Sequence, residues 1–106
     1  MTFALIYVTA VDKEQAHMIA NTLLNERLAA CVNIVPGVQS LYLWQDKVEE
    51  ASEVVMFIKT SADLTQKIVD RVKTLHNYEC PCVIALEFAK GNQDYLKYLA
   101  NCLHMV

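Results

Sequence analysis

A long extended segment with one kink and one tight turn constrains the fold of this chain most strongly. The segment covers residues 31–44, is interrupted by Pro36-Gly37, and ends at a turn formed by Gln45-Asp46, after which a return strand covers residues 48–60. A proline and a glycine do not fit a central paired ladder, so we predict a bulge or bend at that point. A hairpin of this length must either bend over its own core or extend toward a neighbouring molecule.

The composition favours an assembly of several copies. The chain has 106 residues, which predicts one domain spanning residues 1–106. Its hydrophobic fraction of 55% is above the usual share, and a domain of this size leaves much of its surface exposed. We therefore expect part of the apolar surface to be buried between subunits.

The charge balance argues against two kinds of partner. Nine Lys and Arg residues against twelve Asp and Glu residues give a net charge of −3, and no basic run is present. Binding to nucleic acid depends on clustered basic residues that neutralise phosphates, so we expect no nucleic-acid partner. Residues 2–8 have no basic leader and are too short for a signal-peptide core or a membrane span. We expect no membrane insertion and a cytoplasmic location.

The hydrophobic pattern predicts alternating strands and helices. The expected strands cover residues 3–10, 31–44, 48–60 and 83–89, and the expected helices cover residues 12–30, residues 61–76 and a last stretch that begins after Asn92. The order is that of a ferredoxin-like α+β fold with a four-stranded antiparallel sheet and an added C-terminal helix. Two helices cover one face of such a sheet. The apolar second face then needs cover, most simply from a sister subunit.

Several separated blocks resemble the CutA family of divalent-cation tolerance proteins. The blocks are residues 28–36, residues 40–49, Glu53, Lys59-Thr60, residues 76–81 and Tyr95-Leu96. They recur in order over nearly the whole chain. The resemblance implies a ferredoxin-like fold assembled as a cytoplasmic homotrimer and a link to tolerance of copper or other divalent metals. It implies copper binding for some members, and it brings no established reaction, so we expect no enzyme.

Some positions depart from the family pattern. Asp46 stands where the family usually has Gly, Asn77 where it has Pro, and Tyr98 where it often has Trp. The copper ligands that the resemblance suggests are a cysteine in the first strand and two adjacent histidines. Here these positions read Val8 and Leu75-His76, so only His76 carries over.

The candidate metal ligands are His76, Cys80 and Cys82. Two thiolates and an imidazole form a soft ligand set that suits Cu(I) or Zn²⁺, and copper is the expected cofactor, with another divalent metal as the alternative. The residues alone favour a different interpretation. A histidine at a helix end is commonly a surface residue beside exposed carbonyls, and a Cys-x-Cys pair without a second pair is a weak metal signature. The two thiols are then simply packed.

The polar and aromatic residues of the matching blocks form a second candidate set: Tyr42, Trp44, Lys47, Glu53, Lys59, Tyr78 and Glu79. They either fix the register of the subunits through ion pairs and hydrogen bonds or line a ligand cleft between subunits. In such a cleft, Lys59 would anchor an anion, and Tyr78 and Glu79 would supply polar contacts. We predict no catalytic residues, because the chain has no phosphate loop and no evident catalytic triad.

Three hypotheses for the function remain. The first is a trimeric metal-binding protein of divalent-cation tolerance. The second follows from the resemblance of the family's trimer to that of the PII signalling proteins: a module that senses a small molecule or binds a partner without metal chemistry. The third is an inert trimer that holds or localises a partner.

Overall fold

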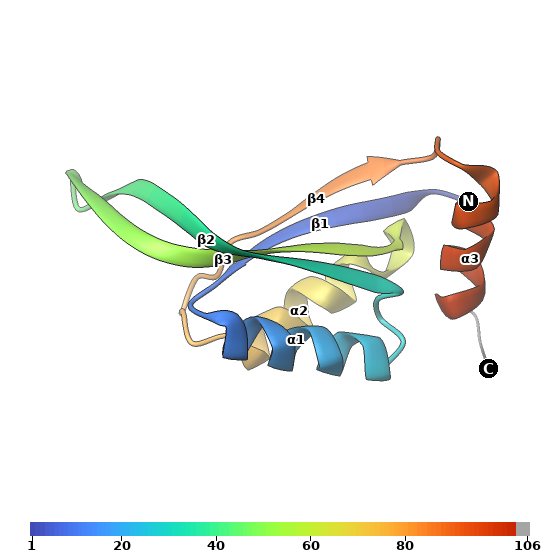
Figure 1. The fold of residues 1–106 in the computed structure, drawn as a ribbon, viewed down its shortest axis with the longest axis horizontal. Coiled ribbons are helices and arrows are strands. Elements are labelled where there is room, and N and C mark those ends of the chain that lie inside the picture. Colours follow the sequence, from blue (N-terminus) through green and yellow to red (C-terminus); the bar gives the residue numbers. More distant parts are fainter. Residues whose placement is uncertain (104–106) are drawn as a thin grey trace.

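The computed structural model describes residues 1–103 and has the expected order of elements (Figure 1). Within these residues, one four-stranded antiparallel sheet has the order β2-β3-β1-β4. The elements are β1 (Phe3–Ala10), α1 (Lys13–Asn25), β2 (Cys31–Trp44), β3 (Lys47–Ser61), the 3₁₀ turn η1 (Ala62–Leu64), α2 (Thr65–Leu75), β4 (Val83–Phe88) and α3 (Gln93–Leu103). The ferredoxin-like α+β prediction is confirmed. No helix in this part of the chain is long and apolar enough to cross a membrane.

The main core lies between one face of the sheet and helices α1 and α2, which both cover that face (Figure 1). Alternate residues of β1 point into it, since successive side chains of a strand face opposite sides. Its fully buried members include Ile6, Val8, Ile19, Leu23, Met56, Ile58, Ile68 and Val72. Each buried aliphatic side chain of this size stabilises the fold by about 1.5–3 kcal/mol.

Helix α1 begins as the sequence indicates. A side-chain oxygen of Asp12 accepts the backbone N–H of Gln15 at 2.8 Å, and Oε1 of Gln15 accepts the backbone N–H of Val11 at 2.8 Å. The two side chains therefore satisfy backbone donors reciprocally, in the manner of a capping box.

The predicted end of this helix near residues 29–30 is wrong, because α1 ends at Asn25. Arg27 adopts a left-handed conformation with φ of 60°. The backbone N–H of Leu28 then donates to the carbonyl oxygen of Leu23 at 2.9 Å, and that of Arg27 donates to Leu24 at 3.1 Å. This is a Schellman ending in which arginine replaces the usual glycine.

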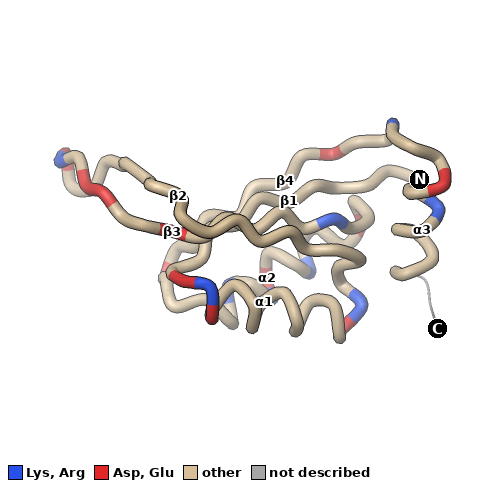
Figure 2. The backbone as a smooth tube through the Cα atoms, viewed as in Figure 1, with Lys and Arg blue, Asp and Glu red and all other residues tan. Residues whose placement is uncertain are grey.

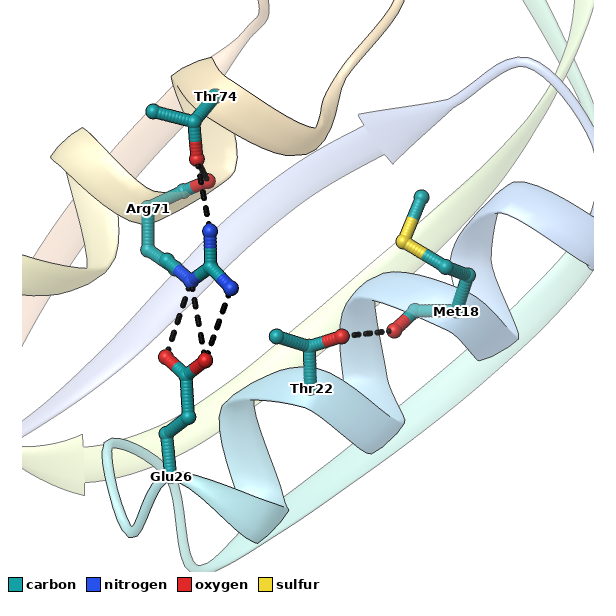
Figure 3. Close-up of polar contacts among 5 residues, drawn as sticks. All are labelled: Met18, Thr22, Glu26, Arg71 and Thr74. Atoms are coloured by element: carbon teal, nitrogen blue, oxygen red, sulfur yellow. Dashed lines mark hydrogen bonds and ion pairs between the residues drawn. The ribbon is translucent and has the colours of Figure 1, made fainter.

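Helix α2 begins at Thr65, four residues after the predicted N-cap Ser61. The Ser61 hydroxyl donates to the carboxylate of Asp63 and caps no backbone N–H. The intervening turn η1 therefore delays the helix. Near its other end, Arg71 joins α2 to Glu26 with Nη2–Oε2 and Nε–Oε1 distances of 2.8 and 2.9 Å (Figure 3).

The long hairpin has the predicted bulge. The register of β2 against β3 shifts between Val35 and Val38, and Gly37 has φ of 77°. The turn residues Gln45 and Asp46 have φ of 51° and 64°, as a two-residue type I′ turn requires. We call residues 38–53 the arm. It projects from the body of the molecule (Figure 1), so the hairpin extends outward. Its charged residues lie at the turn and along β3, whereas its β2 half has none (Figure 2).

The second face of the sheet, which we expected to be covered by a sister subunit, is partly covered by α3 of the same chain. Leu96 and Leu99 of α3 pack on Phe3 at one end of this face, where the Phe3 and Phe88 rings stack at 5.6 Å. The remaining aliphatic and aromatic side chains there are Leu5, Tyr7, Val35, Val55, Phe57, Ile84 and Leu86, and we call this set the open face. Within it, Ile84 and Leu86 are 55% and 63% exposed.

Candidate functional site

His76 forms the junction between the end of α2 and the end of β1. Its side chain is 8% exposed. Its Nε2 lies 2.8 Å from the carbonyl oxygen of Thr9, and its Nδ1 lies 3.0 Å from the backbone nitrogen of Tyr78. Since a carbonyl oxygen only accepts and a backbone N–H only donates, Nε2 carries the proton and Nδ1 accepts. The ring is therefore neutral, and both of its nitrogens are engaged.

This arrangement corrects the interpretation of His76 as a surface residue. The sequence shows that the histidine follows a helix, but it does not show that the end of β1 lies against it. A metal ion at either nitrogen would replace one of the two backbone hydrogen bonds. Within the described chain, the imidazole therefore acts as a structural link.

The two neighbouring thiols differ in their surroundings. Cys80 is exposed and Cys82 is partly buried, and both are free. Burial raises the pKa of the Cys82 thiol, and the nearby negative charge of Glu53 adds to the effect, while a hydrogen bond with Thr9 opposes it. Cys82 is consequently held as a protonated thiol at neutral pH.

A pocket of about 790 Å³ lies where the arm leaves the body. We call it the arm pocket. Its lining residues are Thr9, Ser40, Tyr42, Trp44, Glu49, Ala51, Glu53, Tyr78, Glu79, Cys80 and Cys82. The structure thus brings together seven of the predicted site residues: Tyr42, Trp44, Glu53, Tyr78, Glu79, Cys80 and Cys82. Lys47, Lys59 and His76 are not among the lining residues.

The sequence prediction missed four of the lining residues, and Glu49 is the one among them with an ionisable side chain. Glu49 lies directly opposite Tyr42 in the β2–β3 register. Residues paired across a ladder share a face. The signal was therefore available, because pairing the two strands back from the Gln45-Asp46 turn places Glu49 beside Tyr42.

One hydrogen bond inside the pocket joins the arm to the body. The Tyr78 hydroxyl donates to Oε2 of Glu53 at 3.3 Å. Burial raises the pKa of the Tyr78 phenol, and the charge of Glu53 raises it further. The Tyr78 ring also lies against the His76 ring, with centroids 4.6 Å apart. The base of the arm is thus fixed to the loop that follows α2.

Lys59 lies at the opposite end of the sheet from the arm pocket. Its Nζ is 3.2 Å from the hydroxyl of Tyr95 on α3 and 5.3 Å from the centre of that ring. The hydrogen bond with Tyr95 raises the pKa of Lys59. Glu53 and Lys59 are six residues apart on β3, a separation of roughly 20 Å along a strand. A cleft that combines Lys59 with Tyr78 and Glu79 would therefore need two chains.

The donors in one chain fit a metal site incompletely. In residues 1–103, no group of three or more His, Cys, Asp or Glu side chains is arranged to hold a metal ion. The thiols of Cys80 and Cys82 are the soft donors at the arm pocket, and the carboxylates of Glu53 and Glu79 line the same pocket. In the described chain His76 uses both ring nitrogens for backbone hydrogen bonds, so the predicted set of two thiols and one imidazole stays a prediction.

The fold and the pocket define a ferredoxin-like α+β domain with a projecting arm and an open sheet face. The family of the CutA1 divalent ion tolerance protein matches residues 4–102, and the chain belongs to this family. The Divalent-cation tolerance protein CutA of Thermus thermophilus is 46% identical to it over 89% of this chain and 91% of that protein.

A solved structure and a protein sequence from rice are also similar. The crystal structure of CutA1 from Oryza sativa has a TM-score of 0.95 and 40% identity, and the match covers 100% of this chain and 97% of that one. Protein CutA 1, chloroplastic, from Oryza sativa is 44% identical over 91% of this chain. The chain spans only about half of that longer protein, at 54% of its length.

Proposed function

We propose that the protein acts in divalent-cation tolerance as a cytoplasmic homotrimer and catalyses no reaction. The single observation that carries the assembly is the open face. Leu86 and Ile84 are large apolar side chains left 63% and 55% exposed beside the half-buried Tyr7 and Phe57. Contiguous exposed apolar surface of this kind marks an interaction site, and its burial by sister subunits supplies the free energy of assembly.

The substitution Leu86→Asp tests this assembly. Because Leu86 is exposed in the free chain, an aspartate there leaves the monomer folded but places an uncompensated charge in the proposed interface. We expect a folded monomer by circular dichroism and sedimentation. Ala85→Asp is the matched control, since Ala85 is also exposed but lies on the other face of β4. Leu86→Asp sedimenting as the wild-type oligomer would refute the interface.

For metal binding we propose that Cys80 and Cys82 bind copper as Cu(I). Two thiolates suit this ion, and further donors come from the pocket carboxylates or from a neighbouring subunit. A divalent metal such as Zn²⁺ is the alternative and would use the same thiols. The support is the placement of both thiols at one pocket. His76 would join the site only by releasing Thr9 or Tyr78.

A competition titration with Cu(I) under reducing conditions tests this proposal. We expect Cys80→Ser/Cys82→Ser to lose binding and His76→Gln to retain it. Cys31→Ser is the control, because Cys31 does not line the pocket. Equal affinity of the wild-type protein and the double serine variant would remove these thiols from the site.

The arm pocket favours a second candidate, a PII-like module that senses a small molecule. A cavity of about 790 Å³ lined by Tyr42 and Trp44 has the size and aromatic character of a ligand site. Trp44 is the single tryptophan of the chain, so its fluorescence reports binding directly. A nucleotide panel titrated against metal-free protein tests the idea. Unchanged Trp44 emission with all nucleotides would eliminate them as ligands.

The proposed cytoplasmic location is supported by four free cysteines, since reduced thiols are typical of that compartment. The name of the rice relative places that protein in the chloroplast, so location is not transferable within the family. Cell fractionation with an antibody to the full chain tests it.

A further inference from the structure

Lys59 has a cationic side chain with no acidic partner among the residues that the structure describes. Within residues 1–103, the one ion pair joins Arg71 and Glu26, and the polar contact of the Lys59 ammonium is the neutral hydroxyl of Tyr95. Lys59 shares its side of the sheet with Phe57, two residues away on β3. Covering this face by another molecule would desolvate the ammonium, which is costly unless an anion pairs with it.

The arm has the complementary feature on its pocket side. Glu49 lies across the ladder from Tyr42, and Trp44 is the next residue along on the same side. The Glu49 carboxylate is exposed and makes no hydrogen bond or ion pair in the part of the chain that the structure describes. Glu53, by contrast, already accepts a hydrogen bond from Tyr78. Glu49 is therefore the free carboxylate on this side of the arm.

The two groups cannot meet within one chain. Both lie on β3, ten residues apart, which is roughly 33 Å along an extended strand. The arm strand from Val38 to Trp44 has seven residues and reaches roughly 23 Å beyond the bulge, far enough to lie across part of another copy. A contact between the arm of one copy and the far end of the sheet of the next is heterologous, and three such contacts close a ring.

The aromatic side chains around the two charges are also complementary. Tyr95 and Tyr98 are exposed on one side of α3 with ring centroids 5.7 Å apart, and Tyr95 contacts Lys59. Tyr42 and Trp44 are exposed beside Glu49. Aromatic pairs of this kind add to an interface beyond their buried area.

We infer that Glu49 of one copy pairs with Lys59 of the next copy, so that the pocket side of the arm docks beside Tyr95 and Tyr98 of α3. The inference rests on the proposed homotrimer and adds its register. Each of the three interfaces then contains one Glu49–Lys59 pair. This pair forms only in the arm position that also buries the open face. The opposite side of the arm carries Leu41 and Leu43 together with the carboxylate of Glu50, which lies across the ladder from Leu41. The aromatic side chains that complement Tyr95 and Tyr98 lie on the Glu49 side, which favours Glu49 over Glu50 as the partner of Lys59.

Charge reversal at both positions tests the pairing in full-length protein. We expect Glu49→Lys and Lys59→Glu each to weaken trimer association by at least about tenfold, as loss of a buried charge pair does. The double variant Glu49→Lys/Lys59→Glu restores association to near the wild-type level. Glu50→Lys is the matched control, because Glu50 is the next residue after Glu49 and its side chain points to the opposite side of the arm. We expect this variant to associate like the wild-type protein.

The outcomes are separable. If the wild-type protein is a trimer but the double variant associates no better than the single variants, the pairing is wrong and the trimer stands. Single variants that associate normally also overturn the pairing. A monomeric wild-type protein overturns the trimer and the pairing together. Circular dichroism of each variant ensures that a loss of association reflects the interface and not unfolding.

Discussion

The imidazole Nε2 of His76 donates a hydrogen bond to the carbonyl oxygen of Thr9, with 2.8 Å between the two atoms. This contact joins the end of α2 to the end of β1, and Thr9 itself lines the arm pocket. The segment that follows the histidine contains Tyr78, Cys80 and Cys82. Its position over the pocket therefore depends on a buried polar link and not on apolar packing alone.

Replacement of His76 by alanine is expected to destabilise the fold by about 1–3 kcal/mol. The change leaves the buried Thr9 carbonyl without its donor, and such unsatisfied groups cost this much. Urea unfolding of the full chain measures the effect. His17→Ala is the control, because His17 is exposed and surface changes fall within about 0.5 kcal/mol. Equal stability of both variants would contradict the structural role.

Cys82 is expected to react with iodoacetamide more slowly than Cys80 at neutral pH. Cys80 is exposed, whereas burial raises the pKa of Cys82 and so lowers its thiolate fraction. Mass spectrometry of peptides from timed reactions gives both rates. The alkylation rate of Cys82 should begin to increase at a higher pH than the rate of an exposed thiol with an ordinary pKa. Faster alkylation of Cys82 would show that the pocket does not protect it.

The same shift predicts how stability depends on pH. An acid whose pKa is higher in the folded state binds its proton more tightly there, so its contribution is complete below the unfolded-state pKa and is lost as pH rises through the folded-state value. Cys82 and Tyr78 both have raised pKa values. Unfolding followed by far-UV circular dichroism should show wild-type stability falling more steeply above pH ~9 than that of Cys82→Ala. Parallel curves would argue against the shift.

The ion pair between Glu26 and Arg71 is expected to contribute only modestly and to be sensitive to salt. Hydrogen bonds from Arg71 lower the pKa of Glu26. The ion pair therefore contributes to folding stability above the ordinary carboxyl pKa, and this contribution is lost as pH falls through the folded-state pKa. The stability difference between wild type and Arg71→Met should vanish in about 1 M salt. Lys67→Met, an exposed change on the same helix, controls for general charge effects.

The substitution Asp46→Gly is expected to stabilise the hairpin by roughly 0.5–1 kcal/mol, because Asp46 has a positive φ of 64° that glycine adopts without strain. Gly37→Ala should have the opposite sign. A Cβ at position 37 meets no atom within 4 Å, so its cost comes from φ of 77° alone. Chemical unfolding gives the change in the free energy of unfolding for each variant. Changes of the same sign in both variants would contradict the explanation by backbone conformation.

The elements that sequence reasoning predicted well depend on local rules. Proline beside glycine marked the bulge after Val35, and the Asp12–Gln15 spacing marked the start of α1, because bends and caps involve residues close in sequence. The end of α1 was missed since Arg27 occupies a left-handed position without the glycine that usually signals it.

The site was predicted less completely because its geometry is non-local. Seven of the eleven residues that line the pocket are among the predicted site residues, but Lys59 was grouped with Tyr78 although the two lie at opposite ends of the sheet. The burial of His76 depends on Thr9, which is 67 residues away in the chain. Only the packing of β1 against the end of α2 reveals that contact.

Sedimentation equilibrium of the wild-type protein tests the central claim most directly. The chain has a mass of 12.0 kDa, and the homotrimer predicts three times this mass across the measured concentration range. Open-face residues such as Leu86 are then buried in the assembled protein. A single species at the mass of one chain, with Leu86 and Ile84 left in water, would contradict the proposed assembly and the arm contact derived from it.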